Sequence, residues 1–427
     1  MDEQKYNLYQ SLAELDKLID VETKETDSPN FTLITEKLKA LQENFPESEK
    51  LAEACARVLV KLSAMQTTEK DLVFTIEKIL TLYKEFPDSK DIALQYAKIL
   101  VDLSTQQTVL KERMTTAKKL EKLQQKFQDS HDIALQYARI LVNLSTKQTV
   151  LKERMITAEK LQELYLYFQG SRDIAEALAR ILFNLSTKQT KLNEIENTVE
   201  KLQVLQQQFQ DSNDIALQYA KILFNLSIKQ TELNEIETTA EKLQKLNLNF
   251  QDSPVIAEAL ARILVNLSTK QTKLKKRETT VKKLQQLYLH FQDSRDIAEA
   301  LAKILFNLST KQNKLKELGT TVEKLQVLQQ QCQDSHDIAL QYAKILFNLS
   351  TKQTELNEIE TTVEKFQALQ KQFQDSEKIA FIYGTFLASF PNHQTELSEH
   401  LQTTEIIKKL YKQFSKFMLQ NFDVLFF

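Results

Sequence analysis

A segment near Asp91 returns every 41 residues through most of the chain. The run DSKDIALQYAKILVDLS around Asp91 reappears as DSHDIALQYARILVNLS around Asp132 and as DSRDIAEALARILFNLS around Asp173. Further copies follow around Asp214, Val255, Asp296 and Asp337, with weaker ones at Lys50 and Lys378. A constant period in this range is typical of a solenoid, in which each repeat buries its apolar surface against its neighbours.

Each repeat contains two helical patterns separated by a short polar break. The run KLNEIENTVEKLQVLQQQF from Lys191 and the run DIALQYAKILFNLS from Asp214 both space their apolar residues by three and four. The 427 residues include only three Gly and five Pro, which favours long helices over sheets and tight turns. We therefore predict an all-α fold, an α-solenoid or superhelix of stacked antiparallel helix pairs with about nine repeats.

A serine in the break of every repeat is placed to cap the helix that follows, because its hydroxyl can accept a hydrogen bond from a free backbone N–H. These serines are Ser48, Ser89, Ser130, Ser171, Ser212, Ser253, Ser294, Ser335 and Ser376.

A second pattern makes it ambiguous whether the other helix of the repeat is continuous. Thr361 and Glu364 have the spacing of a capping box in its middle, and Gly319 adjoins the equivalent threonine. The uninterrupted apolar spacing favours one continuous helix over a break.

The two ends differ from the repeats. We predict N-terminal capping helices over residues 1–44, tandem repeats over 45–390, and a C-terminal capping helix with an apolar tail over 391–427. The tail either caps the last repeat, which is the favoured interpretation, or exposes a patch for self-association or a partner. The chain has no signal-like start and no long apolar run, so we expect a cytoplasmic protein with no membrane contact.

Residue types that carry chemistry are sparse. The five histidines are scattered singly, and three glycines cannot form a phosphate-binding loop. Cys55 and Cys332 occupy ordinary packing positions. We therefore predict no catalytic residues, no metal site, no cofactor and no small-molecule substrate. With 56 basic and 58 acidic residues, bulk charge gives no reason to expect nucleic-acid binding.

The segment FPDSKDIALQYAKIL resembles the tetratricopeptide repeat family. Pro46 and Pro87 match the proline that closes a unit, and Tyr96-Ala97 and Tyr219-Ala220 match its large–small pair. The period is seven residues longer than the usual unit, and Gln replaces the proline in most copies, so HEAT-like repeats remain the alternative. The resemblance implies that the first helix of each unit lines a concave groove that receives a peptide.

In this chain the first helix is the one that begins after the recurring serine, as at Ser212. Three kinds of residue recur along one stripe of it. Basic residues occupy one position: Lys98, Arg139, Arg180, Lys221, Arg262, Lys303 and Lys344. A phenylalanine or valine follows three residues later, and the phenylalanines are Phe183, Phe224, Phe306 and Phe347. An asparagine comes next, including Asn184, Asn225, Asn307 and Asn348.

Cations beside apolar groups would suit an acidic, extended peptide, although the same residues could equally pack between repeats and face solvent. Asparagine could grip a peptide backbone or, in the favoured interpretation, terminate the helix. We therefore predict a non-catalytic scaffold that binds an extended peptide or partner protein along the concave face. A nucleic-acid binder using the Lys/Arg ladder and a structural, self-assembling spacer are the alternatives.

Overall fold

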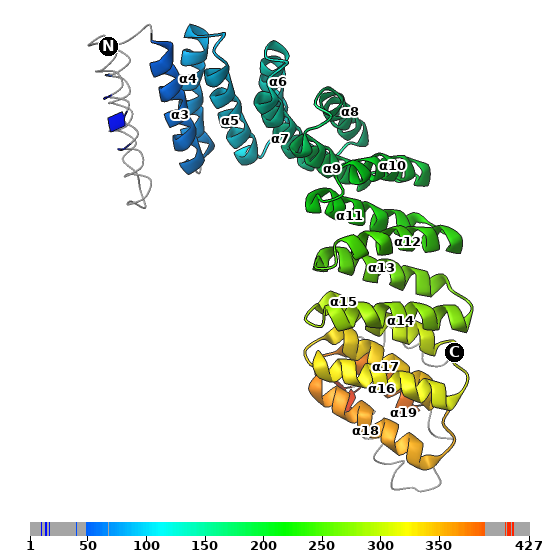
Figure 1. Cartoon of the computed structure of the whole chain (residues 1–427). Coiled ribbons are helices and arrows are strands. Elements are labelled where there is room, and N and C mark those ends of the chain that lie inside the picture. Colours follow the sequence, from blue (N-terminus) through cyan, green and yellow to red (C-terminus); the bar gives the residue numbers. More distant parts are fainter. Residues whose placement is uncertain are drawn as a thin grey trace. The chain divides into compact units, whose positions relative to one another are not determined.

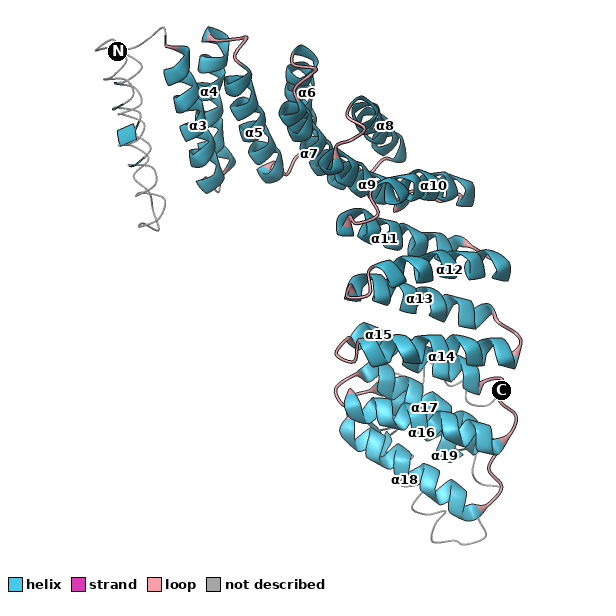
Figure 2. Cartoon of the chain, viewed as in Figure 1, coloured by secondary structure: helices cyan, strands magenta, loops and turns pink. Residues whose placement is uncertain are grey.

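A computed structural model of the chain describes residues 48–66 and 68–388, together with isolated positions between 10 and 40 and between 406 and 413. Every regular element within residues 48–66 and 68–388 is an α-helix (Figures 1 and 2). The odd-numbered helices are α3 (Glu49–Met65), α5 (Lys90–Gln106), α7 (His131–Lys147), α9 (Arg172–Ser186), α11 (Asn213–Lys229), α13 (Pro254–Lys270), α15 (Arg295–Ser309), α17 (His336–Ser350) and α19 (Glu377–Ala388). The even-numbered helices are α4 (Glu69–Glu85), α6 (Leu110–Lys126), α8 (Leu151–Tyr167), α10 (Leu192–Gln208), α12 (Leu233–Asn249), α14 (Leu274–His290), α16 (Leu315–Gln331) and α18 (Leu356–Gln372).

The predicted serine caps begin the odd-numbered helices. The hydroxyls of Ser48, Ser130, Ser171, Ser212, Ser294, Ser335 and Ser376 each accept from a backbone N–H in the first turn. The prediction was wrong for the side chains of two serines. Ser89 makes no capping bond and donates instead to Glu53, at 3.2 Å, and Ser253 precedes Pro254 without a capping bond.

The even-numbered helices run without a break through their central threonines. Helix α16 continues past Gly319, and the hydroxyl of Thr321 donates to Oε1 of Gln312, at 2.9 Å, in the preceding loop. The same buried threonine–glutamine contact recurs at Thr75, Thr116, Thr157, Thr198, Thr239, Thr280 and Thr362. These threonines therefore tie each even-numbered helix to the loop before it, and they do not interrupt the helix.

The chain divides into two compact units, Met1–Tyr219 and Ala220–Phe427, with the boundary inside α11. Within each unit, consecutive odd-numbered helices pack on one another, as α5 does on α7 and α13 on α15, and even-numbered helices pack on the odd-numbered helix that follows, as α8 does on α9 and α14 on α15. This arrangement is an all-α solenoid of stacked antiparallel helix pairs.

The large–small pairs of the sequence lie in the core of this stack. Ala97, Ala179 and Ala302 are fully buried, and the neighbouring Tyr96 is 4% exposed. A small side chain lets two helix backbones approach closely, so these positions serve packing.

Among the described helices, none is long and apolar enough to cross a membrane. The predicted terminal caps, residues 1–44 and 391–427, lie almost wholly outside the described residues. The choice between a capping tail and a self-associating one therefore stays a prediction.

Candidate functional site

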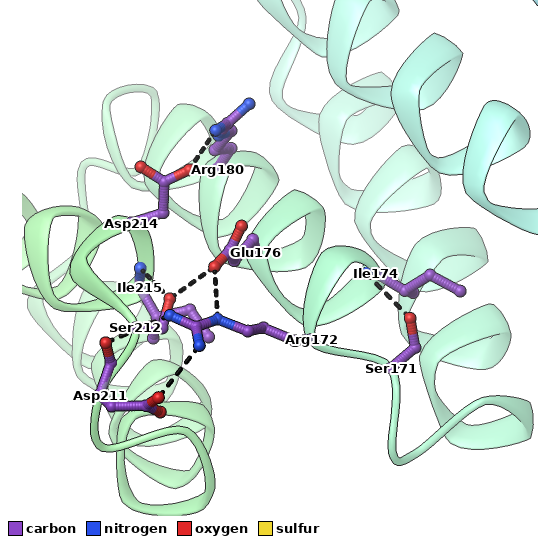
Figure 3. A network of polar contacts seen from close by, with 9 residues as sticks. All are labelled: Ser171, Arg172, Ile174, Glu176, Arg180, Asp211, Ser212, Asp214 and Ile215. Atoms are coloured by element: carbon purple, nitrogen blue, oxygen red, sulfur yellow. Dashed lines mark hydrogen bonds and ion pairs between the residues drawn. The ribbon is translucent and has the colours of Figure 1, made fainter.

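The predicted cations lie along the odd-numbered helices, where several of them pair with an aspartate of the next repeat. Nη2 of Arg262 lies 2.6 Å from Oδ2 of Asp296, and Nζ of Lys303 lies 3.3 Å from Oδ2 of Asp337. Arg180 pairs with Asp214 in the same way (Figure 3). The Arg262 side chain is still 52% exposed, so this part of the stripe presents cation–carboxylate pairs, not bare positive charge.

The remaining cations have different surroundings. Lys98 and Arg139 donate to the glutamine three residues earlier on their own helices, at 3.2 and 3.4 Å. Burial lowers the pKa of Lys344, and repulsion from Lys378 adds to that effect. Lys221 lies half-buried on α11.

The predicted phenylalanines are half-buried beside these cations. The guanidinium of Arg262 lies 5.8 Å from the ring centre of Phe224, and Nζ of Lys344 lies 5.3 Å from that of Phe306. In each case the ring belongs to the preceding repeat, so the cation–π contact joins neighbouring repeats. Phe183 and Phe347 occupy the same position on α9 and α17.

The asparagine ladder joins consecutive repeats through the side-chain amide. Nδ2 of Asn307 donates to the hydroxyl of Ser268, at 2.7 Å, in the preceding odd-numbered helix. The same contact is made by Asn143, Asn184, Asn266 and Asn348. The favoured prediction that these residues terminate helices was wrong, because their helices continue for at least two more residues and their amides bond to the neighbouring repeat. Asn225 holds the equivalent position on α11.

A polar network between α9 and α11 was not predicted from the sequence (Figure 3). The hydroxyl of Ser212 accepts from the N–H of Ile215, at 3.3 Å, and donates to Oε1 of Glu176, at 2.7 Å. Arg172 bonds to the same carboxylate at 3.1 Å and to Asp211 at 3.0 Å. The serine–glutamate contact recurs between Ser89 and Glu53, Ser294 and Glu258, and Ser335 and Glu299. The signal in the sequence was the residue after the recurring alanine, which is glutamate in the IAEA and LAEA runs and leucine in the IALQ runs.

A lysine ladder on the even-numbered helices was also missed. Nζ of Lys160 lies 2.5 Å from Oε1 of Glu121, and the lysines at 201 and 283 donate to glutamine oxygens of the preceding even-numbered helix at 2.9 and 3.0 Å. The recurring E/K-K-L-Q motif carried this signal.

Two hollows open on the odd-helix face at equivalent positions. The first, between α7 and α9, is lined by Arg139, Val142, Asn143, Asp173, Ala177 and Arg180. The second, in the other unit, is lined by Arg262, Val265, Asn266, Asp296, Ala300 and Lys303. Each residue of the second lies 123 positions, or three repeats, after its counterpart in the first. The sequence shows the same three-repeat shift, since DIAEALARILFNLS from Asp173 returns almost unchanged from Asp296.

The cysteines are poor nucleophiles. Burial raises the pKa of the Cys55 thiol to about 12 and also raises that of Cys332, so both remain protonated near neutral pH. In the part of the chain that the structure describes, no group of three or more His, Cys, Asp or Glu residues is arranged to hold a metal ion.

Comparisons with known proteins identify no family. No family model and no curated protein matches the chain. Among solved structures, the chain is similar to the crystal structure of the P58(IPK) TPR domain, with 10% identity over 90% of this chain and 100% of that chain, at a TM-score of 0.26. It is also similar to a computationally designed self-assembling cyclic homo-oligomer, with 12% identity over 85% and 95% of the two chains, at a TM-score of 0.09. At these scores the fold class rests on the helices of this chain alone.

Proposed function

We propose that this chain is a non-catalytic, tetratricopeptide-like scaffold with 41-residue units that binds an extended segment of a partner protein along its odd-numbered helices. The observation that carries the proposal is the recurring hollow described above. In both units it combines an apolar floor, such as Val265 and Ala300, with a rim of charged groups and an asparagine. Binding sites in proteins typically combine an apolar surface with a few polar groups that orient the ligand.

The ion pairs alter the chemistry expected of the partner. A purely acidic peptide would have to displace Asp296 from Arg262, which lie 2.6 Å apart. A segment that carries both charges, with an apolar side chain between them, can pair with each member of the rim. We therefore propose a mixed-charge segment in place of the simply acidic one suggested by the sequence.

The ion pairs also weaken the case for a nucleic acid on this face. Affinity for a nucleic acid comes largely from protein cations that neutralise phosphates and displace the counterions bound there. Arg180, Arg262 and Lys303 instead lie beside carboxylates.

Site-specific photo-crosslinking tests the proposal. A photoreactive amino acid replaces Val265 on the odd-helix face, and a control protein carries it at the exposed Gln330 on α16. We expect a protein partner in native lysate to cross-link from position 265 and not from position 330. Capture should fall when Phe183, Phe224, Phe306 and Phe347 are all changed to Ala while the far-UV circular dichroism stays unchanged. Equal cross-linking from both positions would contradict the proposal.

A further inference from the structure

The outer side of α14 differs in charge from the outer sides of its neighbours. Between Leu274 and His290, α14 carries five lysines or arginines against one glutamate. Helix α12 carries two lysines against three glutamates, and α16 carries two lysines against two glutamates. Arg277 is 6% exposed, so the exposed excess on α14 comes from its lysines. Helix α6 carries a similar excess, but the helices on either side of α14 do not.

Two substitutions within the repeat create most of the excess. Lys282 stands where α12 has Glu241 and α16 has Glu323, and Lys276 stands where those helices have Glu235 and Glu317. As a result, the first turn of α14 has no acidic residue. Positive charge near a helix N-terminus opposes the helix dipole, so this arrangement reduces the stability of α14.

Several of these cations have no partner inside the fold. Lys276 pairs with Glu237 at 2.7 Å, and Lys283 bonds to Gln244. By contrast, Lys273, Lys275 and Lys282 are exposed, and their ammonium groups have no hydrogen-bond or ion-pair partner among the described residues. The odd-helix cations Arg180, Arg262 and Lys303, which pair with aspartates, differ from them in this respect.

An apolar area lies at the other end of the same stripe. Lys275, Lys282 and Leu289 follow one another at spacings of seven residues on the outer side of α14, and Leu289 is 67% exposed. At that end of α14, a hollow is lined by Leu248, Leu260, Leu287, His290 and Phe291. Leu248, which is 58% exposed, is the equivalent of Leu289 one repeat earlier.

We propose that the outer side of α14, from Lys273 to Leu289, binds an extended acidic peptide segment of a partner protein, with an apolar side chain of that segment in the hollow lined by Leu248 and Leu287. The stripe from Lys275 to Leu289 is about 21 Å long at 1.5 Å per helical residue, which matches about six extended residues. Acidic side chains pair with the free ammonium groups of Lys273, Lys275 and Lys282, and the apolar side chain is buried against Leu248 and Leu287.

The flanking helices favour a thin ligand over a broad one. Glu241 on α12 and Glu323 on α16 are exposed on either side of Lys282 in the repeat register. Side chains of consecutive even-numbered helices meet, as those of Lys276 and Glu237 do at 2.7 Å, so charges on neighbouring helices act on the same ligand. A membrane surface or a nucleic-acid duplex would cover both glutamates and be repelled by them, whereas a single peptide chain along α14 avoids them.

A fluorescein-labelled peptide of about six glutamates followed by two leucines tests this site by fluorescence anisotropy on the full-length chain. We expect Lys282→Glu to weaken binding about tenfold, because it replaces an attractive charge with a repulsive one. The variant restores the residue present in both neighbouring repeats, so we expect its thermal unfolding midpoint to be equal to or higher than that of the wild type.

The matched control is Lys118→Glu on α6, which makes the same change at the same position of another cation-rich helix. There the equivalent of Leu289 is Gln125, and the hollow beside it is lined by Glu121 and Glu163. We expect Lys118→Glu to change peptide affinity less than twofold. Equal losses in both variants, or no binding by the wild type in low salt, would overturn the proposal. Binding of single-stranded DNA or phosphatidylserine vesicles in place of the peptide would also overturn it, by identifying a different occupant.

Discussion

The paired cations of the odd-helix face and the exposed lysines of α14 differ in whether they have a partner within the fold. On the odd-helix face, the cations Arg180, Arg262 and Lys303 pair with an aspartate of the next repeat. On α14, Lys275 and Lys282 are exposed and have no partner among the described residues. The periodic contacts hold consecutive repeats together, whereas the departures from the period leave charge available for a ligand. In a chain of near-identical repeats, the differences between repeats are therefore as informative as the similarities.

Deleting residues 274–314 is expected to have the clearest outcome. This deletion removes one whole repeat, α14 and α15. Asn348, which now donates to the hydroxyl of Ser309, would then face Ser268, the equivalent serine one repeat earlier. Because each repeat contacts mainly its neighbours, we expect a shorter solenoid that still unfolds cooperatively in urea. Deleting only residues 274–293, which removes α14 alone, should cause aggregation or loss of helix by circular dichroism. If both deletions were tolerated equally, repeats would not be the unit of stability.

A buried arginine gives the largest expected effect of a single substitution. Arg277 is 6% exposed, and its guanidinium donates to the backbone carbonyl of Gln271, at 2.7 Å, and to that of Asn307. Burial lowers the pKa of this side chain. Changing Arg277 to Ala leaves those carbonyls with fewer donors and opens a cavity, so we expect a loss of about 3 kcal/mol in urea unfolding.

The matched control for that substitution is Arg277→Ile, because Ile236 fills the same position one repeat earlier and is 1% exposed. We expect the isoleucine variant to lose at least about 1 kcal/mol less than the alanine variant, since it fills the space. Equal losses would show that the hydrogen bonds, and not the packing, set the cost.

The serine caps offer a smaller and more selective test. Ser335 caps the N–H of Ile338 at 3.3 Å and donates to Glu299 at 3.0 Å, whereas Ser253 makes no capping bond. We expect Ser335→Ala to cost about 1–2 kcal/mol in urea unfolding and Ser253→Ala to cost only a few tenths. A similar cost for both would mean that the cap contact contributes little to stability.

The smallest effect concerns Asp102, which replaces the ladder asparagine in one repeat. The hydroxyl of Ser63 lies 2.7 Å from its carboxylate and 2.8 Å from the carbonyl of Val60, but it has only one proton to donate. An asparagine would donate to that hydroxyl and leave its proton for the carbonyl. We therefore expect Asp102→Asn to raise the thermal unfolding midpoint at neutral pH.

That gain should depend on pH. Burial raises the pKa of Asp102, and the hydrogen bond from Ser63 opposes the shift. A raised pKa means that the contribution of Asp102 to stability is fully present below its unfolded pKa of about 4 and is lost as pH rises through the folded pKa. The difference between variant and wild type should therefore shrink as the pH falls toward about 4. A difference that does not change with pH would rule out ionisation as the cause.

Much of the fold could be predicted from the sequence, because the signals were local and repeated. The apolar spacing placed the helix pairs, and the serine before each odd-numbered helix marked its first residue. The side-chain partners could not be predicted in the same way. Asn307 was interpreted as a helix terminator, but it bonds to Ser268, 39 residues away. A lone sequence shows that such residues recur and does not show which of them meet.

The candidate site, too, could be predicted from the sequence only in part. The positions of the cations and phenylalanines on one stripe followed from helical spacing. Their pairing with aspartates depended on the stacking distance between consecutive odd-numbered helices, which only the tertiary structure provides. The free lysines of α14 became informative only when the paired ones were known.

The sequence by itself determined the all-α class, the pairing of helices within each repeat and the places where helices begin, because these follow from local spacing and backbone capping. The tertiary structure decided which charges are neutralised and which remain free. Pairing between repeats depends on distances between side chains about 40 residues apart, and the period of the sequence does not contain those distances.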